Sequence, residues 1–324
     1  MQTTSAPTTA SSTSPSRRGR PLKVGFQLPE IEYVARWPEL LAMTRTAEAV
    51  GFDSVWVGDH LLYRSPGEEA RGPWEAWSVL AALAATTTRI ELGPLVAATS
   101  FHNPALLAKK AATIDEISGG RLILGLGAGW NEVEYRAYGF PFDHRISRFE
   151  EAFTIIRTLL ADRAIDFDGR YFQARDCELV PRGPRPGGPP LLIGSSGERM
   201  LRITMPHADA WNAWYATTGN EPAGVRPLRE QVDAACLEVG RDPASVARTV
   251  AVFVRLPGGG ARVEGDYSDR HVKPLDGSAG PERLAAELRA YAAEGIGHVQ
   301  LVLDPITEAS IAALAPMLEL LDAR

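Results

Sequence analysis

The chain has few cysteines, no long apolar run and no basic stretch beyond its first residues. Only Cys177 and Cys236 occur in 324 residues, in no CxxC or metal-type spacing, so neither a disulfide framework nor a zinc site is indicated. No run of 18 apolar residues is present, which predicts no membrane span. A net charge of -6, without a basic cluster after residue 23, argues against nucleic acid as a partner. We expect a cytoplasmic protein with reduced cysteines.

The first 21 residues differ in composition from the rest. They are rich in Ser, Thr, Ala and Pro and contain no acidic residue, so they cannot bury enough apolar surface to fold. We expect a disordered tail over 1–21 and a single domain over 22–324. Arg17-Arg18 resembles the start of a twin-arginine signal, but no apolar stretch of signal-peptide length follows, and we expect no export.

From residue 22, short apolar runs alternate with longer amphipathic ones, a pattern typical of parallel strands joined by helical crossovers. The candidate strands are 22–28, 54–57, 90–96, 121–127, 190–194, 208–212, 247–255 and 298–303. The candidate helices are 37–50, 74–87, 104–118, 145–160, 198–205, 226–239, 281–293 and 307–321. Eight such pairs, in a chain that is 45% hydrophobic, predict an α/β fold, a (β/α)8 TIM barrel with insertion segments.

Two stretches interrupt the alternation. Within 161–189, the run 167–172 is typical of a hairpin and 182–190 of a turn-rich connector. Residues 256–280 form the second interruption. Loops of this length are commonly functional lids or disordered segments, and the sequence does not distinguish these for 256–280.

Two glycine-containing motifs follow candidate strands and precede candidate helices. Leu124-Gly-Leu-Gly-Ala-Gly-Trp-Asn131 lacks the third glycine of a dinucleotide fingerprint, which disfavours a nicotinamide fold. Its glycines permit either the close approach of a flat ring to the backbone or close strand packing. Gly194-Ser-Ser-Gly197 is the better phosphate candidate, because amides and hydroxyls gather before a helix. The alternative is an ordinary Gly-Ser turn with a helix cap.

Asp59 and His60 follow the second candidate strand, where barrel enzymes place catalytic groups. An imidazole exchanges protons near neutral pH, and a neighbouring carboxylate orients it or raises its pKa. The alternative is that Asp59 caps the next segment and His60 is packed. His102 lies just before the helix that begins at 104, where it could face the mouth of a cofactor site or cap the helix, and we favour the cap. The remaining histidines show no metal-ligand spacing, and HExxH is absent, so no metal is assigned.

Longer blocks of sequence add a resemblance to a family. Gly51-Phe-Asp-Ser-Val-Trp-Val-Gly-Asp-His60, the block from Ile117 to Phe140 and Ile193-Gly-Ser-Ser-Gly197 resemble the bacterial luciferase-like flavin oxidoreductase superfamily. The middle block most resembles its branch that uses the deazaflavin coenzyme F420. The resemblance extends from about residue 22 to 215, and the C-terminal third contributes no matching motif.

The resemblance implies a cofactor with a flat, isoalloxazine-like ring system at the carboxyl end of the barrel. A non-prolyl cis peptide at Leu95-Val96 would lie beside this ring. Asp59 and His60 would contact the ring region, and Gly194, Ser195, Ser196 and Gly197 the phosphate. The other implied cofactor contacts are Leu95, Val96, Ala98, Gly127, Ala128, Gly129 and Trp130. Several deazaflavin enzymes of the family have a hydroxyl residue where this chain has Ala98.

The implied function is an F420-dependent oxidoreductase that transfers a hydride between the deazaflavin C5 and a small organic substrate, with His60 as proton donor or acceptor. One alternative is a luciferase-type monooxygenase that uses reduced FMN and oxygen with a partner reductase. Another is a barrel that binds a flavin without turnover. Relatives imply a homodimer. The substrate would be set by loops at 61–73, 131–145 and 256–280, where Tyr63, Trp74, Tyr135, Tyr138, Phe140 and Phe142 suit an apolar pocket or packing between loops.

Overall fold

Parallel pairing of short apolar strands organises the chain around a barrel. The computed structural model describes residues 19–64, 67, 69–260 and 272–323. The barrel strands are β1 (Lys23–Gln27), β2 (Ser54–Val57), β3 (Glu91–Pro94), β4 (Ala97–Ala98), β5 (Leu124–Gly127), β8 (Leu191–Ile193), β9 (Ala210–Ala213), β10 (Ala247–Arg255) and β12 (His298–Asp304). Their order is β3-β2-β1-β12-β10-β9-β8-β5-β4.

The two ends of this sheet meet, so the barrel closes. Leu92 of β3 forms a parallel bridge with Leu122, just before β5, and β4 pairs with β5. Because β3 and β4 are two parts of one interrupted strand, the barrel has eight strands, and the predicted fold class is confirmed.

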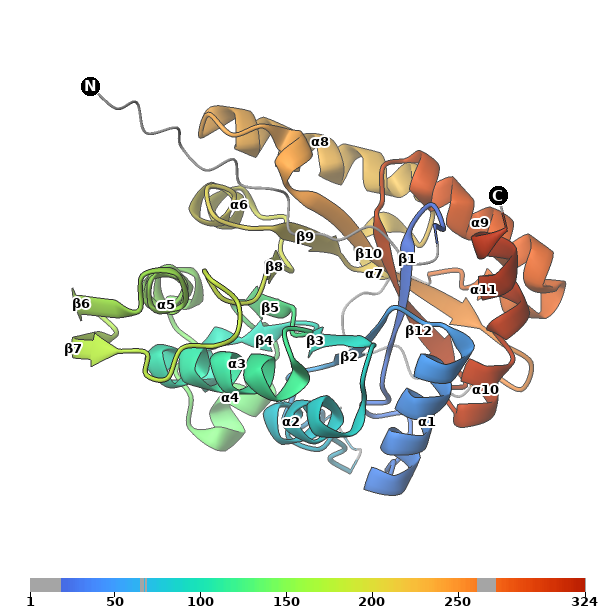
Figure 1. The fold of residues 1–324 in the computed structure, drawn as a ribbon, viewed down its shortest axis with the longest axis horizontal. Helices are drawn as coiled ribbons and strands as arrows, with labels where there is room; N and C mark the ends of the chain where they lie inside the picture. The colour runs from blue at the N-terminus through green and yellow to red at the C-terminus, as the bar shows by residue number, and fades with distance from the viewer. Residues whose placement is uncertain (1–18, 65–66, 68, 261–271, 324) are drawn as a thin grey trace.

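Helices cover the outside of the barrel (Figure 1). They are α1 (Trp37–Val50), α2 (Ala76–Thr86), α3 (Pro104–Ser118), α4 (Glu132–Tyr138), α5 (Arg145–Asp162), α6 (Glu198–Thr204), α7 (Tyr215–Thr218), α8 (Pro222–Glu238), α9 (Pro281–Ala293), α10 (Glu308–Ala312) and α11 (Ala315–Asp322). No helix within the described ranges is long and apolar enough to cross a membrane.

Most helix boundaries agree with the sequence pattern. Asn103 caps α3 through its side-chain oxygen, which accepts from the Leu106 amide at 3.0 Å. The predicted helix over 307–321 is wrong as one element, because it divides into α10 and α11. Pro316 lies in the first turn of α11 and has no N–H to continue the preceding helix. The short helices α4 and α7 were not predicted, since each lies in a stretch interpreted as a loop.

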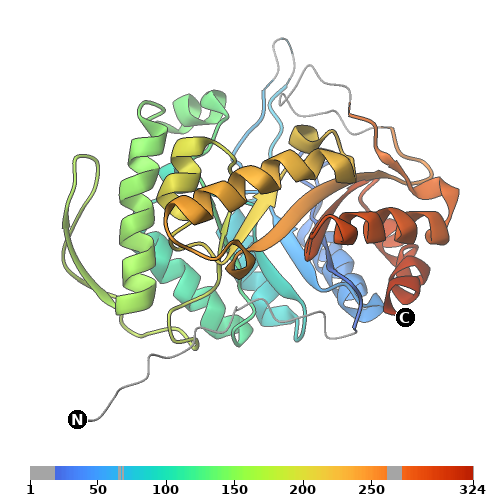
Figure 2. The same cartoon turned by 90° about the horizontal axis from the view of Figure 1, so that it is seen from above.

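The predicted hairpin is confirmed as β6 (Ala164–Asp168) and β7 (Gln173–Glu178), which pair antiparallel. It extends beyond α5 in both views (Figures 1 and 2). In the second interruption, β11 (Leu275–Asp276) pairs with β10, and residues 261–271 lie outside the described residues.

The predicted tail is described only at its end, since residues 1–18 lie outside the described ranges. There Arg20 is buried and pairs with Asp53 at 3.3 Å and with Asp322 at 2.7 Å. The contact with Asp322 joins the first described residues to the C-terminal helix α11.

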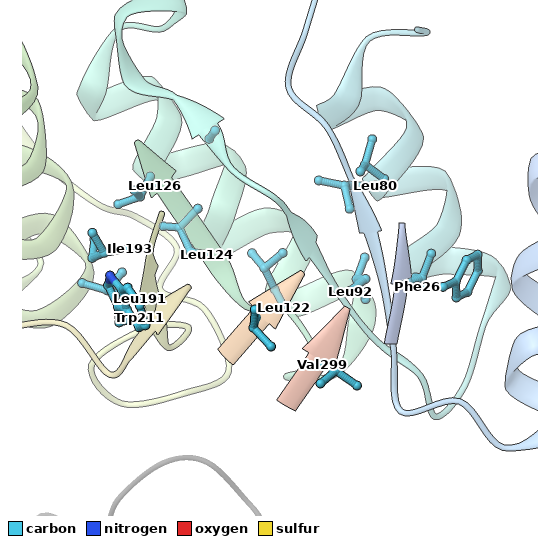
Figure 3. Packing of buried hydrophobic residues seen from close by; sticks show 14 of the residues in the cluster. Phe26, Leu80, Leu92, Leu122, Leu124, Leu126, Leu191, Ile193, Trp211 and Val299 are labelled. Carbon is cyan, nitrogen blue, oxygen red and sulfur yellow. The ribbon is translucent and has the colours of Figure 1, made fainter. Parts of the chain in front are cut away.

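Alternation along the strands divides the core into an outer layer and a barrel interior. Figure 3 shows part of the outer layer, with Phe26, Leu92, Leu124, Ile193 and Val299. Trp56, Leu95, Leu192 and Ala210 form a separate interior cluster. Polar side chains share this interior: the Asn212 amide donates to Thr249 and to Gln300, both at 2.8 Å. The strands therefore turn a polar lining inward and an apolar surface toward the helices.

A buried histidine lies among these interior groups. His298 Nε2 is 2.7 Å from the Ser54 hydroxyl, which also accepts from the Trp56 indole at 2.7 Å. Burial, with a smaller effect of the nearby Lys23 charge, holds the pKa of His298 well below its ordinary value. The folded protein thus keeps this imidazole neutral.

We expect acid to destabilise the fold through His298. The unfolded imidazole takes up a proton below about pH 6.5, whereas the folded one does not, so stability falls with falling pH, approaching about 1.4 kcal/mol per pH unit. His298→Gln removes this dependence. The test is urea denaturation of both proteins, followed by circular dichroism, at pH 7.5, 6.5 and 5.5. His144→Gln, at an exposed imidazole, should keep the wild-type dependence; parallel curves for wild type and His298→Gln would contradict the prediction.

Candidate functional site

The predicted site segments meet at the carboxyl ends of the strands. Asp59 and His60 follow β2, residues 127–130 end and follow β5, and residues 194–197 follow β8. In a parallel barrel all these strand ends lie on one face. The topology therefore brings together segments that are far apart in the sequence.

Asp59 holds the backbone of the neighbouring strand. Its carboxylate Oδ2 accepts from the Ala98 amide at 3.0 Å and lies 2.9 Å from Nε2 of His102. Asp59 is only 3% exposed, so both contacts form away from water. The expectation that His102 caps α3 is wrong, because Asn103 supplies that cap and the imidazole of His102 faces Asp59 instead.

The carboxylate that bonds His60 is Glu134 on α4. Its Oε1 lies 2.9 Å from His60 Nδ1, and its Oε2 accepts from the Leu61 amide at 2.8 Å. Glu134 is 1% exposed, so its carboxylate contacts the residues of the site and not solvent. Glu134 was not predicted as a site residue, because α4 lies in a stretch interpreted as a loop. Its only signal was a carboxylate soon after the glycine motif.

The surroundings of His60 favour its protonated form. Burial alone would lower the pKa of His60, but the hydrogen bond with Glu134 and the charges of Glu30, Glu134 and Asp59 together raise it above the ordinary value. Opposite charges close to an imidazole stabilise the imidazolium. His60 is therefore suited to hold a proton at neutral pH.

Two aromatic rings lie beside His60. The ring of Tyr63 is 4.8 Å from the imidazole and that of Trp130 is 5.6 Å, between centroids. Asn131 donates to the Leu62 carbonyl at 3.0 Å, which joins the loops that carry the two rings. The two aromatic rings therefore form an apolar wall beside the imidazole.

The loop that carries Trp130 is fixed by side chains from later helices. The Tyr135 hydroxyl donates to the Ala128 carbonyl at 2.8 Å, and Arg145 donates to the Gly129 carbonyl at 2.9 Å. Gly129 has φ +74°, and a Cβ there would lie 1.9 Å from the Tyr135 hydroxyl. Only glycine fits this position.

The peptide bond between Leu95 and Val96 is cis, as the resemblance implied. Beyond it, the Val96 side chain packs against glycines of two neighbouring segments. A Cβ on Gly125 or Gly194 would lie 3.0 Å from a Val96 methyl, and one on Gly127 would lie 2.8 Å away. Close packing thus accounts for these glycines without a ligand.

The loop 194–197 exposes hydrogen-bond donors. The Ser195 carbonyl accepts from the Trp211 indole at 2.8 Å, which fixes the loop against β9. Ser195 and Ser196 are half-buried, and neither hydroxyl bonds another residue in the described part of the chain. A Cβ on Gly197 would meet nothing within 4 Å. This set of free hydroxyls and small residues suits the oxygens of a phosphate.

The loop aromatics divide between the two expected roles. Tyr135, Phe140 and Phe142 pack with Phe101 between loops, and Tyr138 is exposed. Tyr63 lies beside His60, and Trp74 lines a pocket. Part of the aromatic set therefore faces open space near the site, and the rest is core.

The structure is a parallel eight-stranded TIM barrel. Its polar and aromatic side chains gather at the carboxyl ends of the strands, where TIM-barrel enzymes have their active sites. The family model described as Luciferase-like monooxygenase matches residues 11–298, and the chain belongs to this family. The expected resemblance is confirmed.

Individual relatives and structures are similar to this chain. It is 32% identical over 221 residues to the 5,10-methylenetetrahydromethanopterin reductase of Archaeoglobus fulgidus, which covers 68% of this chain and 60% of the relative. It is 36% identical over 182 residues to an F420-dependent glucose-6-phosphate dehydrogenase of Amycolatopsis mediterranei, covering 54% and 52%. The match thus spans only about half to three fifths of these relatives. In fold, it resembles an F420-dependent secondary alcohol dehydrogenase solved with an F420-acetone adduct (TM-score 0.77, 20% identity, 94% of this chain and 99% of that one).

We expect Gly127→Ala to destabilise the protein by about 1–3 kcal/mol, because the added methyl overlaps Val96. In a Val96→Ala background the same substitution should cost less, since that variant removes the overlapping methyls. Chemical denaturation of the four proteins of this cycle measures the coupling. Gly197→Ala, which enters open space, serves as control and should change stability by less than about 0.5 kcal/mol. Equal costs for Gly127→Ala in the two backgrounds would contradict the packing role of Val96.

Proposed function

We propose that this protein is an oxidoreductase that uses coenzyme F420 and transfers a hydride between its deazaflavin C5 and a small organic substrate. The His60–Glu134 pair carries the proposal, because it keeps a proton at the carboxyl end of the barrel where this family binds its cofactor. The F420-dependent glucose-6-phosphate dehydrogenase relative supports the choice of cofactor.

The described residues fit such a cofactor. Ser195 and Ser196, with Gly194 and Gly197, would hold its phosphate through free hydroxyls and backbone amides. The ring would lie beside Leu95-Val96, Ala98 and residues 127–130. Asp59 would contact the ring region. Its carboxylate, which accepts from the Ala98 amide, would also keep Ala98 in place. When bound, the deazaflavin supplies or accepts the hydride.

His60 would act on the proton that accompanies the hydride. Its Nδ1 is engaged by Glu134, so Nε2 is the atom left to face a substrate. An imidazole with a raised pKa donates a proton to a carbonyl oxygen that is being reduced, or takes one from a hydroxyl that is being oxidised. Glu134 would orient the ring and stabilise its charge, and the rings of Tyr63 and Trp130 would restrict water around it.

The cofactor is tested by titrating the purified protein with coenzyme F420 and, separately, with FMN, following quenching of its tryptophans. We expect saturable micromolar or tighter binding of F420 and negligible binding of FMN. Ser195→Ala/Ser196→Ala should weaken F420 binding about tenfold through lost hydrogen bonds to the phosphate. The reverse preference would overturn the proposal and support an FMN-dependent monooxygenase with a partner reductase.

The proton role of His60 is tested with Glu134→Gln. The substitution removes a hydrogen bond and a negative charge that raise the pKa of His60, so the midpoint of its titration should move to lower pH. In carbonyl reduction, activity falls as pH rises through this pKa, and in alcohol oxidation it rises. Both profiles should therefore shift acidward in the variant.

NMR titration of the His60 imidazole gives the same midpoint without turnover. Glu132→Gln, on the same helix but exposed, is the matched control and should leave the midpoint in place. An unchanged midpoint in Glu134→Gln would refute the assignment.

A further inference from the structure

A pocket lies between the loops that follow β1 and β2. Its cavity volume is about 160 Å³, below that of pockets that enclose a whole drug-sized ligand, so it has room for one group of a larger molecule. Its buried walls are Leu28, Leu40, Val57 and Val79. They belong to β2, α1, α2 and the segment after β1, and Figure 1 shows α1 and α2 close to these strands. The pocket therefore has loop residues around its opening and outer-layer core residues of the barrel as its floor.

Aromatic and apolar side chains form the rim of this pocket. Tyr33, Val34 and Trp74 are 39%, 69% and 51% exposed. The Trp74 indole donates to the Ala35 carbonyl at 2.7 Å, which fixes the ring while half of its surface faces solvent. An exposed group of large apolar residues around a hollow is typical of a binding site for an apolar ligand.

The charge of the lining restricts the ligand further. Among the described residues that line the pocket, Glu30 is the charged one, and none is Lys or Arg. A phosphate or carboxylate placed there would lose hydration without a cation to replace it. An anion is thus disfavoured. The Glu30 carboxylate already accepts from Gln27 and Tyr63, so the lining suits an uncharged ligand.

Glu30 connects the pocket to the candidate site. It lines the pocket, and its carboxylate accepts from the Tyr63 hydroxyl at 2.9 Å. The Tyr63 ring in turn lies 4.8 Å from His60. A Cβ on Gly58, next to Asp59, would overlap the Glu30 side chain. One side chain therefore separates the pocket from the groups around His60.

The strand order places the pocket away from the phosphate loop. From β1 to β8 there are four steps around the barrel in either direction, through β2 or through β12. The pocket lies beside β1, and the loop 194–197 follows β8. A cofactor held by that loop would reach the barrel centre from the side opposite the pocket.

We propose that this pocket binds the apolar, uncharged portion of the organic substrate, which enters from the β1 side of the barrel. The substrate role rests on the proposed function, whereas the binding of an uncharged apolar group does not. The substrate is accordingly a neutral molecule with a hydrocarbon or aromatic group next to its reacting carbon, rather than a phosphate ester.

The first test is a titration of the full chain with N-phenyl-1-naphthylamine, a neutral probe that fluoresces in apolar surroundings. We expect saturable binding that persists at saturating F420. Val34→Asp places a carboxylate on the rim and should weaken binding at least about tenfold; Trp74→Ala should weaken it too. Val180→Asp makes the same change at an exposed valine elsewhere and should leave binding within about twofold. Equal binding by Val34→Asp and Val180→Asp would overturn the proposal.

The second test compares two displacing ligands of equal chain length, 2-octanone and octanoate. The neutral ketone should displace the probe at a concentration at least about tenfold lower than the anion, because the pocket offers no cation. Stronger displacement by octanoate would overturn the proposal. If F420 fails to bind while the probe and ketone do, the proposed function fails and the apolar site stands. If F420 binds and the probe does not, only the pocket assignment fails.

Discussion

The hydrogen bond between the Ala98 amide and the Asp59 carboxylate is the contact on which the site depends. It links the end of β2 to the second part of the third strand, where Val96 packs onto the glycines of β5 and the loop after β8. Four of the eight barrel strands therefore meet through one carboxylate and one valine. The buried Asp59 carboxylate is a hydrogen-bond acceptor that holds this edge of the barrel together. It affects His60 only electrostatically, by helping to raise the pKa of the imidazole.

The electrostatics of the site follow from that arrangement. With Asp59 engaged by Ala98 and His102, the hydrogen bond to His60 comes from Glu134 on a different segment. Glu30 adds a third carboxylate from the segment after β1. A buried imidazole without such neighbours would be neutral. His298, the first residue of β12, is an example, since its pKa is well below the ordinary value. The pKa of the same side chain thus shifts in opposite directions in one barrel, because three carboxylates raise it at His60, whereas burial, with a smaller effect of Lys23, lowers it at His298.

The sequence predicts the barrel well, because alternation of strands and amphipathic helices depends on local patterns of apolar residues. It also places Asp59 and His60 correctly, because the end of a parallel strand is recognisable from the run before it. It misassigns the partner of His60, since Glu134 lies 74 residues away on a helix of seven residues. Such a short helix has too few turns for periodicity to be read. The role of Val96 is equally hidden, because the glycines that receive it belong to separate strands.

The glycines near the strand ends differ in why they are small: some lie where a side chain would clash or be strained, and others border open space. Gly127 and Gly194 are small because Val96 fills the space beside them, and Gly125 because the Pro94 carbonyl lies there as well. Gly129 is glycine because its backbone has positive φ beneath the Tyr135 hydroxyl. Gly197, in contrast to these four glycines, borders open space. A glycine-rich motif is therefore weak support for a ligand until each Cβ position is examined. Here the loop with the free serine hydroxyls follows β8, and the apolar pocket lies beside β1, on the opposite side of the barrel. In the function proposed above, that separation would keep the phosphate of the cofactor away from the uncharged part of the substrate.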